Sequence, residues 1–149
     1  MKKIILILAI ALFVNYANAQ KIDAKDLPVT VTGAFAKLYP AIKDVKWEKE
    51  NGNFEANFDL NKVETSVLFD PIGTLLETES EIKISELPKN ATDYITKTYP
   101  NVKIKEASRI KDAKGVITYE AAWKGIEVTF DAKGTFIKEH KEPASKEKD

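Results

Sequence analysis

The sequence repeats itself, and this repeat limits the fold more than any other feature of the chain. At an offset of 60 positions, identical residues align at Ile22 and Ile82, Leu27-Pro28 and Leu87-Pro88, Thr32 and Thr92, Lys37 and Lys97, and Tyr39-Pro40 and Tyr99-Pro100. A repeat of this length is typical of one supersecondary unit that is present twice. We therefore expect residues 20–81 and 82–141 to be two copies of one structural unit.

Each copy is predicted to begin with a helix. In the first copy the apolar side chains have the i, i+4, i+7, i+8 spacing of one helical stripe, formed by Val31, Phe35, Leu38 and Tyr39. Pro28 and Pro88 suit a first helical turn, and each Tyr-Pro pair ends the helix because the residue before proline disfavours the α region. The offset then predicts equivalent core positions for Phe35 and Ile95.

After each helix the hydrophobic period changes from 3.6 to 2, which indicates strands. The alternating runs are 45–47, 54–60, 63–69 and 74–79 in the first copy, and 102–110, 116–123, 126–130 and 135–140 in the second. The sequence thus predicts an α+β fold of two tandem repeats. Each repeat is expected to be a helix plus a four-stranded antiparallel meander, with the helices packed on one face of the sheets.

Two turns between these runs share the pattern Phe-Asp-x-x-Gly-Thr, at residues 69–74 and 130–135. Aspartate at the first turn position can accept bonds from backbone N–H groups, and glycine at the fourth can adopt positive φ. Asp70 and Asp131 are therefore predicted to be turn residues. A role as cation ligands is the weaker interpretation, because no other carboxylate follows at the spacing of a cation-binding loop.

The first nineteen residues have the pattern of a secretory signal peptide. Lys2 and Lys3 precede an apolar run from 4 to 14, and small residues follow at Ala17 and Ala19. The run would rise only about 16 Å as a helix, which is too short to span a bilayer. We expect cleavage before Gln20, a periplasmic or secreted location, and no membrane insertion after cleavage. The polar segment 142–149 is expected to be disordered.

The chain offers little catalytic or cofactor chemistry. It contains 23 basic and 23 acidic residues and no cysteine, so thiolate metal sites, iron–sulfur clusters and cysteine nucleophiles are excluded, and nucleic acid is not an expected partner. No phosphate loop, dinucleotide glycine motif, His-Glu-x-x-His motif or nucleophile elbow occurs. No cofactor is expected. The only histidine, His140, is expected to be an exposed surface residue.

Strand alternation predicts one polar sheet face that carries the candidate binding residues. We expect this face to be broad, solvated and slightly acidic, and to bind a protein through Lys46, Glu48, Glu55, Asn57, Ser66, Glu120, Glu127 and Thr129. Trp47 and Trp123 have the parity of the opposite, apolar face. They are expected in the core, although the sequence leaves open that they lie on the binding face instead.

Acidic residues offer a second interpretation. Alternate glutamates such as Glu77 and Glu79 project to one side of a strand, so they could form a cation patch or a glycosidase-like pair. The simpler reading is a solvated strand whose edge charges discourage aggregation. Asp59, Asn61 and Glu64 loosely resemble a calcium loop but lack its glycine and its length, so a polar hairpin turn is expected there.

The order of these features resembles the PepSY-like family. The matching features are Leu-Pro, a short helix that ends in Tyr-Pro, an aromatic strand, and Phe-Asp-x-x-Gly-Thr before a strand with acidic residues, over about residues 22–141. Members with two copies are similar to the secreted beta-lactamase inhibitor protein. The resemblance implies tandem α+β units whose sheets can join into one curved surface with helices on the other side. It carries over no functional residue.

Taken together, export, repetition and the lack of catalytic motifs lead us to expect a non-enzymatic module that binds an exported protein. Inhibition of an extracytoplasmic enzyme is one form that such binding can take. The alternative is a small acidic periplasmic protein that binds a ligand or cation through Glu77, Glu79 and their neighbours. A third interpretation is an enzyme with an unrecognised carboxylate site.

Overall fold

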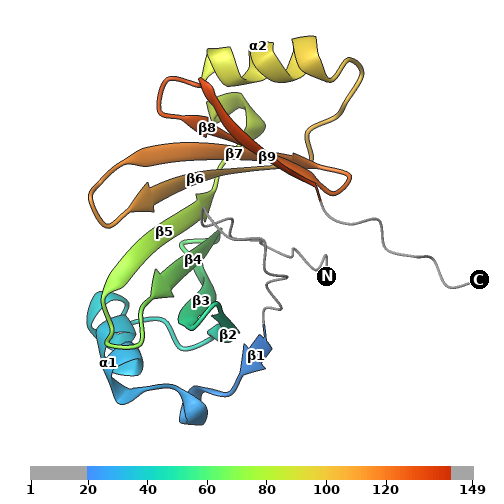
Figure 1. Ribbon diagram of the computed structural model, residues 1–149. Helices are drawn as coiled ribbons and strands as arrows, with labels where there is room; N and C mark the ends of the chain where they lie inside the picture. Colours follow the sequence, from blue (N-terminus) through green and yellow to red (C-terminus); the bar gives the residue numbers. More distant parts are fainter. Residues whose placement is uncertain (1–19, 142–149) are drawn as a thin grey trace, which may run out of the picture.

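The computed structural model describes residues 20–141, which form two α-helices and nine strands (Figure 1). The predicted signal peptide and C-terminal tail lie outside these residues. The first half contains β1 (Gln20–Ile22), a 3-10 turn (Ala24–Asp26), α1 (Val29–Leu38), β2 (Lys46–Glu50), β3 (Asn53–Leu60), β4 (Val63–Phe69) and β5 (Leu75–Glu81). The second half contains a 3-10 turn (Ile84–Glu86), α2 (Lys89–Thr98), β6 (Glu106–Asp112), β7 (Ile117–Trp123), β8 (Ile126–Asp131) and β9 (Phe136–Lys141).

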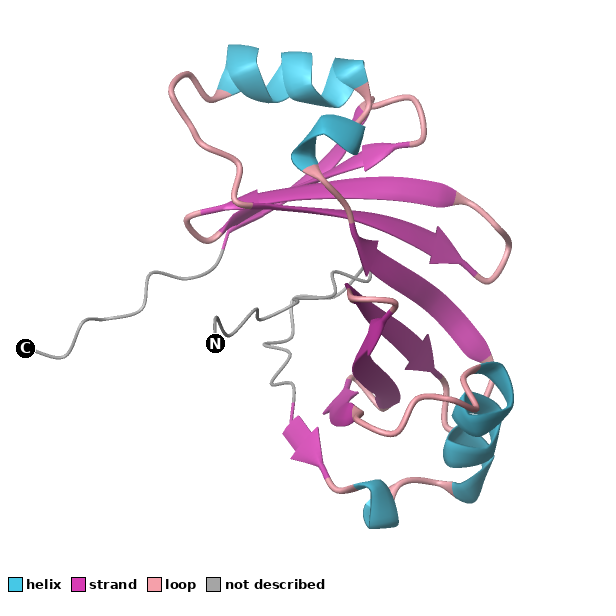
Figure 2. Ribbon diagram, turned by 180° about the vertical axis from the view of Figure 1, so that it is seen from behind, coloured by secondary structure: helices cyan, strands magenta, loops and turns pink. Residues whose placement is uncertain are grey.

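All nine strands belong to one antiparallel sheet, in which every strand pairs with its neighbours in sequence order from β1 to β9. The sheet is strongly twisted and curved. Both helices lie on its outer face, α1 over the first half and α2 over the second (Figure 2). The α+β class and the tandem repetition agree with the prediction, and the strands form one continuous sheet, as the family resemblance implied.

The register of the sheet shows that the repeat is structural. In the first half, Lys21 of β1 pairs with Glu48 of β2. In the second half, Glu81 of β5 pairs with Ser108 of β6, and each of these residues lies sixty positions after its counterpart. The strand β5 therefore has two roles: it is the last strand beside β4 and it takes the place of β1 beside β6. This shared strand is the reason that the two halves cannot separate into independent sheets.

Two hairpins differ in length between the halves. Trp47 pairs with Ala56 in the first half, and the equivalent pair in the second half is Ala107 with Ala121. More residues separate the second pair, so the β6–β7 hairpin is longer than the β2–β3 hairpin. Ala56 pairs with Val67 in the first half, and the equivalent pair in the second half is Ala121 with Val128. Fewer residues separate the second pair, so the β7–β8 hairpin is shorter than the β3–β4 hairpin. The insertion and the deletion nearly cancel. This explains why the sequence aligns at an offset of 60 near the helices and 61 near the last turns.

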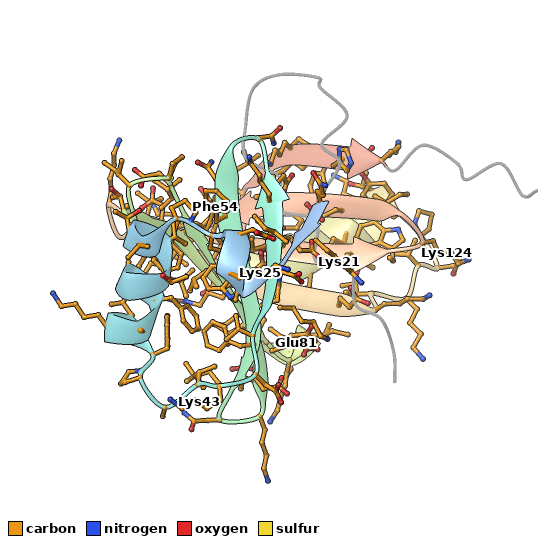
Figure 3. All side chains as sticks on the ribbon, turned by 90° about the horizontal axis from the view of Figure 1, so that it is seen from below. Lys21, Lys25, Lys43, Phe54, Glu81 and Lys124 are labelled. Atoms are coloured by element: carbon orange, nitrogen blue, oxygen red, sulfur yellow. The ribbon has the colours of Figure 1, made fainter. Side chains whose placement is uncertain are left out.

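Each helix covers its own hydrophobic core. In the first, Phe35 of α1 contacts the rings of Trp47 and Phe58 at centroid distances of 5.3 and 5.2 Å. In the second, Ile95 of α2 packs with Trp123 and other buried residues of β6–β8. Figure 3 shows Phe54 of β3 on the side of the sheet that faces α1. The equivalent core positions predicted for Phe35 and Ile95 are confirmed.

The two Phe-Asp-x-x-Gly-Thr turns attach the sheet to the helix N-termini. Asp70 Oδ1 accepts bonds from the N–H groups of Ile72 and Thr74, and Asp131 Oδ1 accepts the equivalent pair. Gly73 and Gly134 have φ of 85° and 81°, as predicted. The Thr30 side chain donates to the carbonyl of Pro71, and Asn90 donates to that of Lys133, both at 2.9 Å. The aspartates are therefore turn residues.

Several local predictions are corrected by the structure. The short strand β1 was not predicted, and β6 begins at Glu106, because residues 102–105 form an irregular connection after α2. Pro28 and Pro88 are N-cap residues rather than members of the first turn. Leu38, predicted on the buried stripe, is 48% exposed. Over residues 20–141, neither helix is long and apolar enough to cross a bilayer.

Candidate functional site

The register places all eight predicted site residues on the sheet face opposite the helices. In the first half, Lys46 pairs with Asn57, Asn57 with Ser66, and Glu48 with Glu55. In the second, Glu120 pairs with Thr129, and Glu127 pairs with His140. Because paired residues of an antiparallel sheet share a face, these side chains form one surface, here called the polar face. Trp47 and Trp123 lie on the other face, in the cores, as predicted.

The polar face is concave. The two halves of the sheet curve away from their helices, so that their inner faces approach one another (Figure 1). Side chains from strands that are not neighbours consequently interact. The charges of Glu55 on β3 and of Glu120 on β7 both raise the pKa of Glu79 on β5. Lys138 likewise interacts with Glu77, although β9 and β5 are four strands apart in the sheet.

The curvature buries part of the surface that the sequence predicted to be solvated. Ser66 and Thr129 are buried, and Glu55 and Glu120 are only 1% and 5% exposed. Two apolar residues, Leu68 and Ile110, are also buried on this face. Lys46 remains exposed, whereas Glu48, Asn57 and Glu127 are half-buried. The expectation of a uniformly solvated face is therefore wrong at four of its eight residues.

The carboxylates of the polar face have altered acidity because the curvature removes them from water. Burial raises the pKa of Glu55 to about 7, against a smaller opposing effect of the hydrogen bond to Ser66. Burial, together with the nearby charge of Glu120, raises the pKa of Glu77 to about 7. Both groups therefore exchange protons near neutral pH. The face can change its charge within the ordinary range of environmental pH.

Glu79 occupies the centre of the polar face, although the sequence placed it in the alternative cation patch and not on the protein-binding face. It is 3% exposed, and its Oε2 atom has no hydrogen-bond partner, as is also true of Oε1 of Glu55. Burial and the charge of Glu120 raise the pKa of Glu79 well above its ordinary value. The sequence suggested an exposed edge strand here. Instead, β5 is the central strand of the sheet. The one feature of the sequence that could have placed Glu79 on the polar face is the alternation of glutamates along this strand.

Glu55 and Glu120 are equivalent positions of the two halves with different partners. Glu120 Oε1 accepts a 2.8 Å hydrogen bond from Thr129, its neighbour on β8. Glu55 faces Leu68 at the equivalent position and instead interacts with Ser66. Burial raises the pKa of Glu120, and the Thr129 bond lowers it to a smaller extent. The two halves thus present the same carboxylate in different surroundings.

The remaining candidates have structural or peripheral positions. Asn61 and Lys62 form a two-residue hairpin turn with φ of 53° and 70°, as expected from a polar turn. His140 is exposed at the end of β9. Within residues 20–141, no three His, Asp or Glu side chains come together in an arrangement that could hold a metal ion. The arrangement can therefore offer charge and hydrogen bonds to a partner, on a curved surface that extends over both halves.

Comparison with known proteins matches this chain to a family and to several solved structures. The family model, described as beta-lactamase-inhibitor-like and PepSY-like, matches twice, over residues 14–77 and 54–138. No curated protein matches the sequence. One similar structure is a Bacteroides eggerthii protein described as periplasmic, with 15% identity, a TM-score of 0.66, and 77% of this chain and 88% of that chain covered.

Two further structures support the same fold. A DUF2874 family protein from Bacteroides ovatus has 20% identity and a TM-score of 0.63, with 77% of this chain and 87% of that chain covered. A BLIP-like protein from Bacteroides fragilis has 21% identity and a TM-score of 0.57, with 80% and 89% covered. At these identities the likeness establishes the architecture only.

Proposed function

Because the chain belongs to the PepSY-like, beta-lactamase-inhibitor-like family, we propose that it is an exported, non-enzymatic module that binds another protein through its polar face. It acts outside the cytoplasm, in the periplasm or beyond it. The partner is an exported protein, and inhibition of an extracytoplasmic enzyme is the outcome that the family description favours.

One observation carries this proposal: the two repeats contribute to a single concave surface on a continuous sheet. The shared strand β5 fixes the inner faces of both halves relative to one another. Preorganised surfaces lose little conformational entropy on binding, which favours affinity. The curved face also presents polar and charged groups without a catalytic constellation, because the single histidine is exposed and no nucleophile motif is present.

We also propose residues 1–19 as a cleaved signal peptide and residues 20–81 and 82–141 as the two units, each a helix followed by four antiparallel strands. The equivalent registers of the two halves support the limits proposed for the two units. The alternative is a cation-binding protein based on Glu77 and Glu79. It gains no support from the structure, because within residues 20–141 no three His, Asp or Glu side chains are arranged to hold a metal ion.

Site-specific cross-linking tests the binding proposal. A photoreactive amino acid replaces Asn57 on the polar face, and in a matched control it replaces Lys97 on α2, which is exposed on the opposite side. Cross-linking in the exported fraction should yield a defined adduct from the Asn57 variant and none from the Lys97 variant. The purified adduct partner is then assayed for inhibition. Equal adducts from both variants, or none from either, would refute the polar face as the binding surface.

A charge exchange gives an independent measurement. The variant Lys46→Glu with Glu48→Lys alters the accessible rim of the polar face and leaves its net charge unchanged. Because neither residue is buried, the unfolding midpoint should change little. The yield of the Asn57 adduct should fall if the face recognises its partner by charge complementarity.

A further inference from the structure

The outermost strand of the second half, β9, has the same position in its unit as β5 has in the first. In the first half, β4 and β5 pair Leu68 with Glu77 and Ser66 with Glu79. The equivalent pairs of β8 and β9 in the second half are Thr129 with Lys138 and Glu127 with His140. Both strand pairs contain a register shift at the same place, beside Phe69 and Phe130. The two strands therefore have equivalent backbones.

The two strands differ in what lies on their outer side. The strand β6 pairs with the outer edge of β5, whereas among the described residues no strand pairs with the outer edge of β9. The N–H of Ala113 donates to the carbonyl of Leu76, and that of Ile82 donates to the carbonyl of Ala107, so alternate residues of β5 face β6. The equivalent outward-facing residues of β9 are Ile137, Glu139 and Lys141.

We propose that the outer edge of β9 is a docking site for one extended strand of a partner protein, which pairs antiparallel in the register that β6 adopts on β5. The edge of β5 already accepts such a strand, because β6 pairs with it. The edge of β9 should accept one in the same way, because β9 has the same pairing with its inner neighbour and the same bulge as β5. Ile137, the counterpart of Leu76, is 50% exposed, so a docked segment would also cover apolar surface. Strand addition to an exposed sheet edge is a general mode of peptide recognition.

The side chains of β9 define the chemistry of the partner strand. In the register of β5 and β6, Glu139 would face the position of Lys111, and Lys141 would face the position of Arg109. Opposite charges in facing positions stabilise a sheet, and like charges destabilise it. The preferred strand therefore carries an acidic residue opposite Lys141 and a basic residue opposite Glu139. At present these two side chains form an ion pair with each other, at 2.6 Å.

This edge is distinct from the polar face, so the two proposals fail separately. The edge presents backbone N–H and carbonyl groups in the plane of the sheet, whereas the polar face presents side chains perpendicular to it. A partner held only on the concave face would leave the outward amides of β9 exposed to solvent.

A peptide with the sequence of residues 105–112, carrying Arg109→Glu, is the probe. It places glutamate opposite Lys141 and lysine opposite Glu139. The control peptide has the same composition, with the glutamate and lysine at these two positions exchanged. Binding is followed by NMR of the purified protein, which reports each amide. We expect the outward amides of Glu139 and Lys141 to become protected from hydrogen exchange on peptide addition, while those of Lys138 and His140, which face β8, change little.

A proline variant separates edge pairing from other binding. Glu139→Pro removes an outward N–H that β8 does not use, and proline is tolerated at such edge positions. Glu139→Ala, the matched control, removes the same side chain but keeps the N–H. Loss of one backbone bond and its geometry should weaken peptide binding about tenfold in the proline variant relative to the alanine variant. The β8 amides confirm that each variant is folded.

Selective protection of the Glu139 and Lys141 amides by the probe peptide, with weaker binding of the exchanged peptide, would support the proposal. Three results would overturn it: no protection at millimolar peptide, equal affinity of the proline and alanine variants, or protection that is confined to the polar face. If the proline variant fails to fold, the hydrogen-exchange result on the unmodified protein decides the question.

Discussion

Thr129 donates a 2.8 Å hydrogen bond to Glu120 across neighbouring strands of the polar face, and both side chains are buried. The equivalent residues of the first half, Leu68 and Glu55, cannot form this bond, because leucine has no donor. The same fold position is therefore stabilised by different interactions in the two halves. This difference allows each half to be tested separately.

Thr129→Val should lower the free energy of unfolding by about 1–3 kcal/mol, because it leaves a buried carboxyl oxygen without its donor while it preserves the shape of the side chain. Thr129→Ser keeps the hydroxyl group and should retain most of the stability. Chemical denaturation of the two variants measures the difference. If valine and serine had equal effects, the hydrogen bond would contribute nothing to stability.

The raised pKa of Glu55 predicts that the fold loses stability as pH rises. The folded state holds the proton more tightly than the unfolded state, in which the pKa is near 4.5, so the stabilisation is complete below about pH 4.5 and is lost as pH approaches about 7. The loss from this group amounts to about 3 kcal/mol, because the pKa of Glu55 rises from 4.5 to about 7 and each pKa unit corresponds to about 1.4 kcal/mol. Urea denaturation between pH 4 and 8 measures the slope.

Glu55→Gln provides the matched variant for this pH dependence, because it keeps the shape of the neutral carboxyl group. It should have little effect at pH 4 and should be more stable than the unmodified protein at pH 8. Equal stability differences at both pH values would show that folding does not raise the pKa of Glu55. Burial also raises the pKa of Glu79, so this group should contribute to the same loss of stability as pH rises.

Gly73 and Gly134 should be intolerant of any side chain. A Cβ at Gly73 would lie 2.5 Å from the carbonyl oxygen of Thr30, and one at Gly134 would lie 2.6 Å from the backbone nitrogen of Ala91. Gly115, with a φ of 84° and open space around it, is the control. We expect Gly115→Ala to cost about 1–2 kcal/mol from backbone conformation alone. Gly73→Ala and Gly134→Ala should cost distinctly more, as measured by thermal unfolding, and equal losses at all three sites would argue against the close packing of turn and helix.

Phe35→Ala and Ile95→Ala should each destabilise the half to which the residue belongs. Both side chains are buried beneath equivalent helices, so truncation should cost about 3–5 kcal/mol for phenylalanine and 2–5 kcal/mol for isoleucine. Because β5 belongs to the sheet of both halves, unfolding should remain a single cooperative transition in calorimetry. Two separate transitions would show that the shared strand does not couple the halves.

The sequence by itself determined the local structure and the repetition. Helical stripes, alternation and turn residues are local signals, because they depend on backbone geometry over a few residues. They correctly predicted both helices, eight of the nine strands, the Asp70 and Asp131 turns, and the face on which Glu55 and Glu120 lie. The three-residue strand β1 was missed because so short a segment has no measurable period.

Only the tertiary structure decided the position of β5 and the burial of the polar face. Alternation shows which side chains share a face, but it does not contain the twist and curvature that bring distant strands together. Glu77 and Glu79 therefore resembled the charges of an exposed edge strand, whereas pairing with both β4 and β6 places them at the centre of the sheet. Curvature then brings Glu79 close to Glu55 and Glu120, and the loss of water changes the acidity of all three. Burial and charge interaction depend on contacts between residues that are far apart in sequence, and for that reason no local pattern could have revealed them.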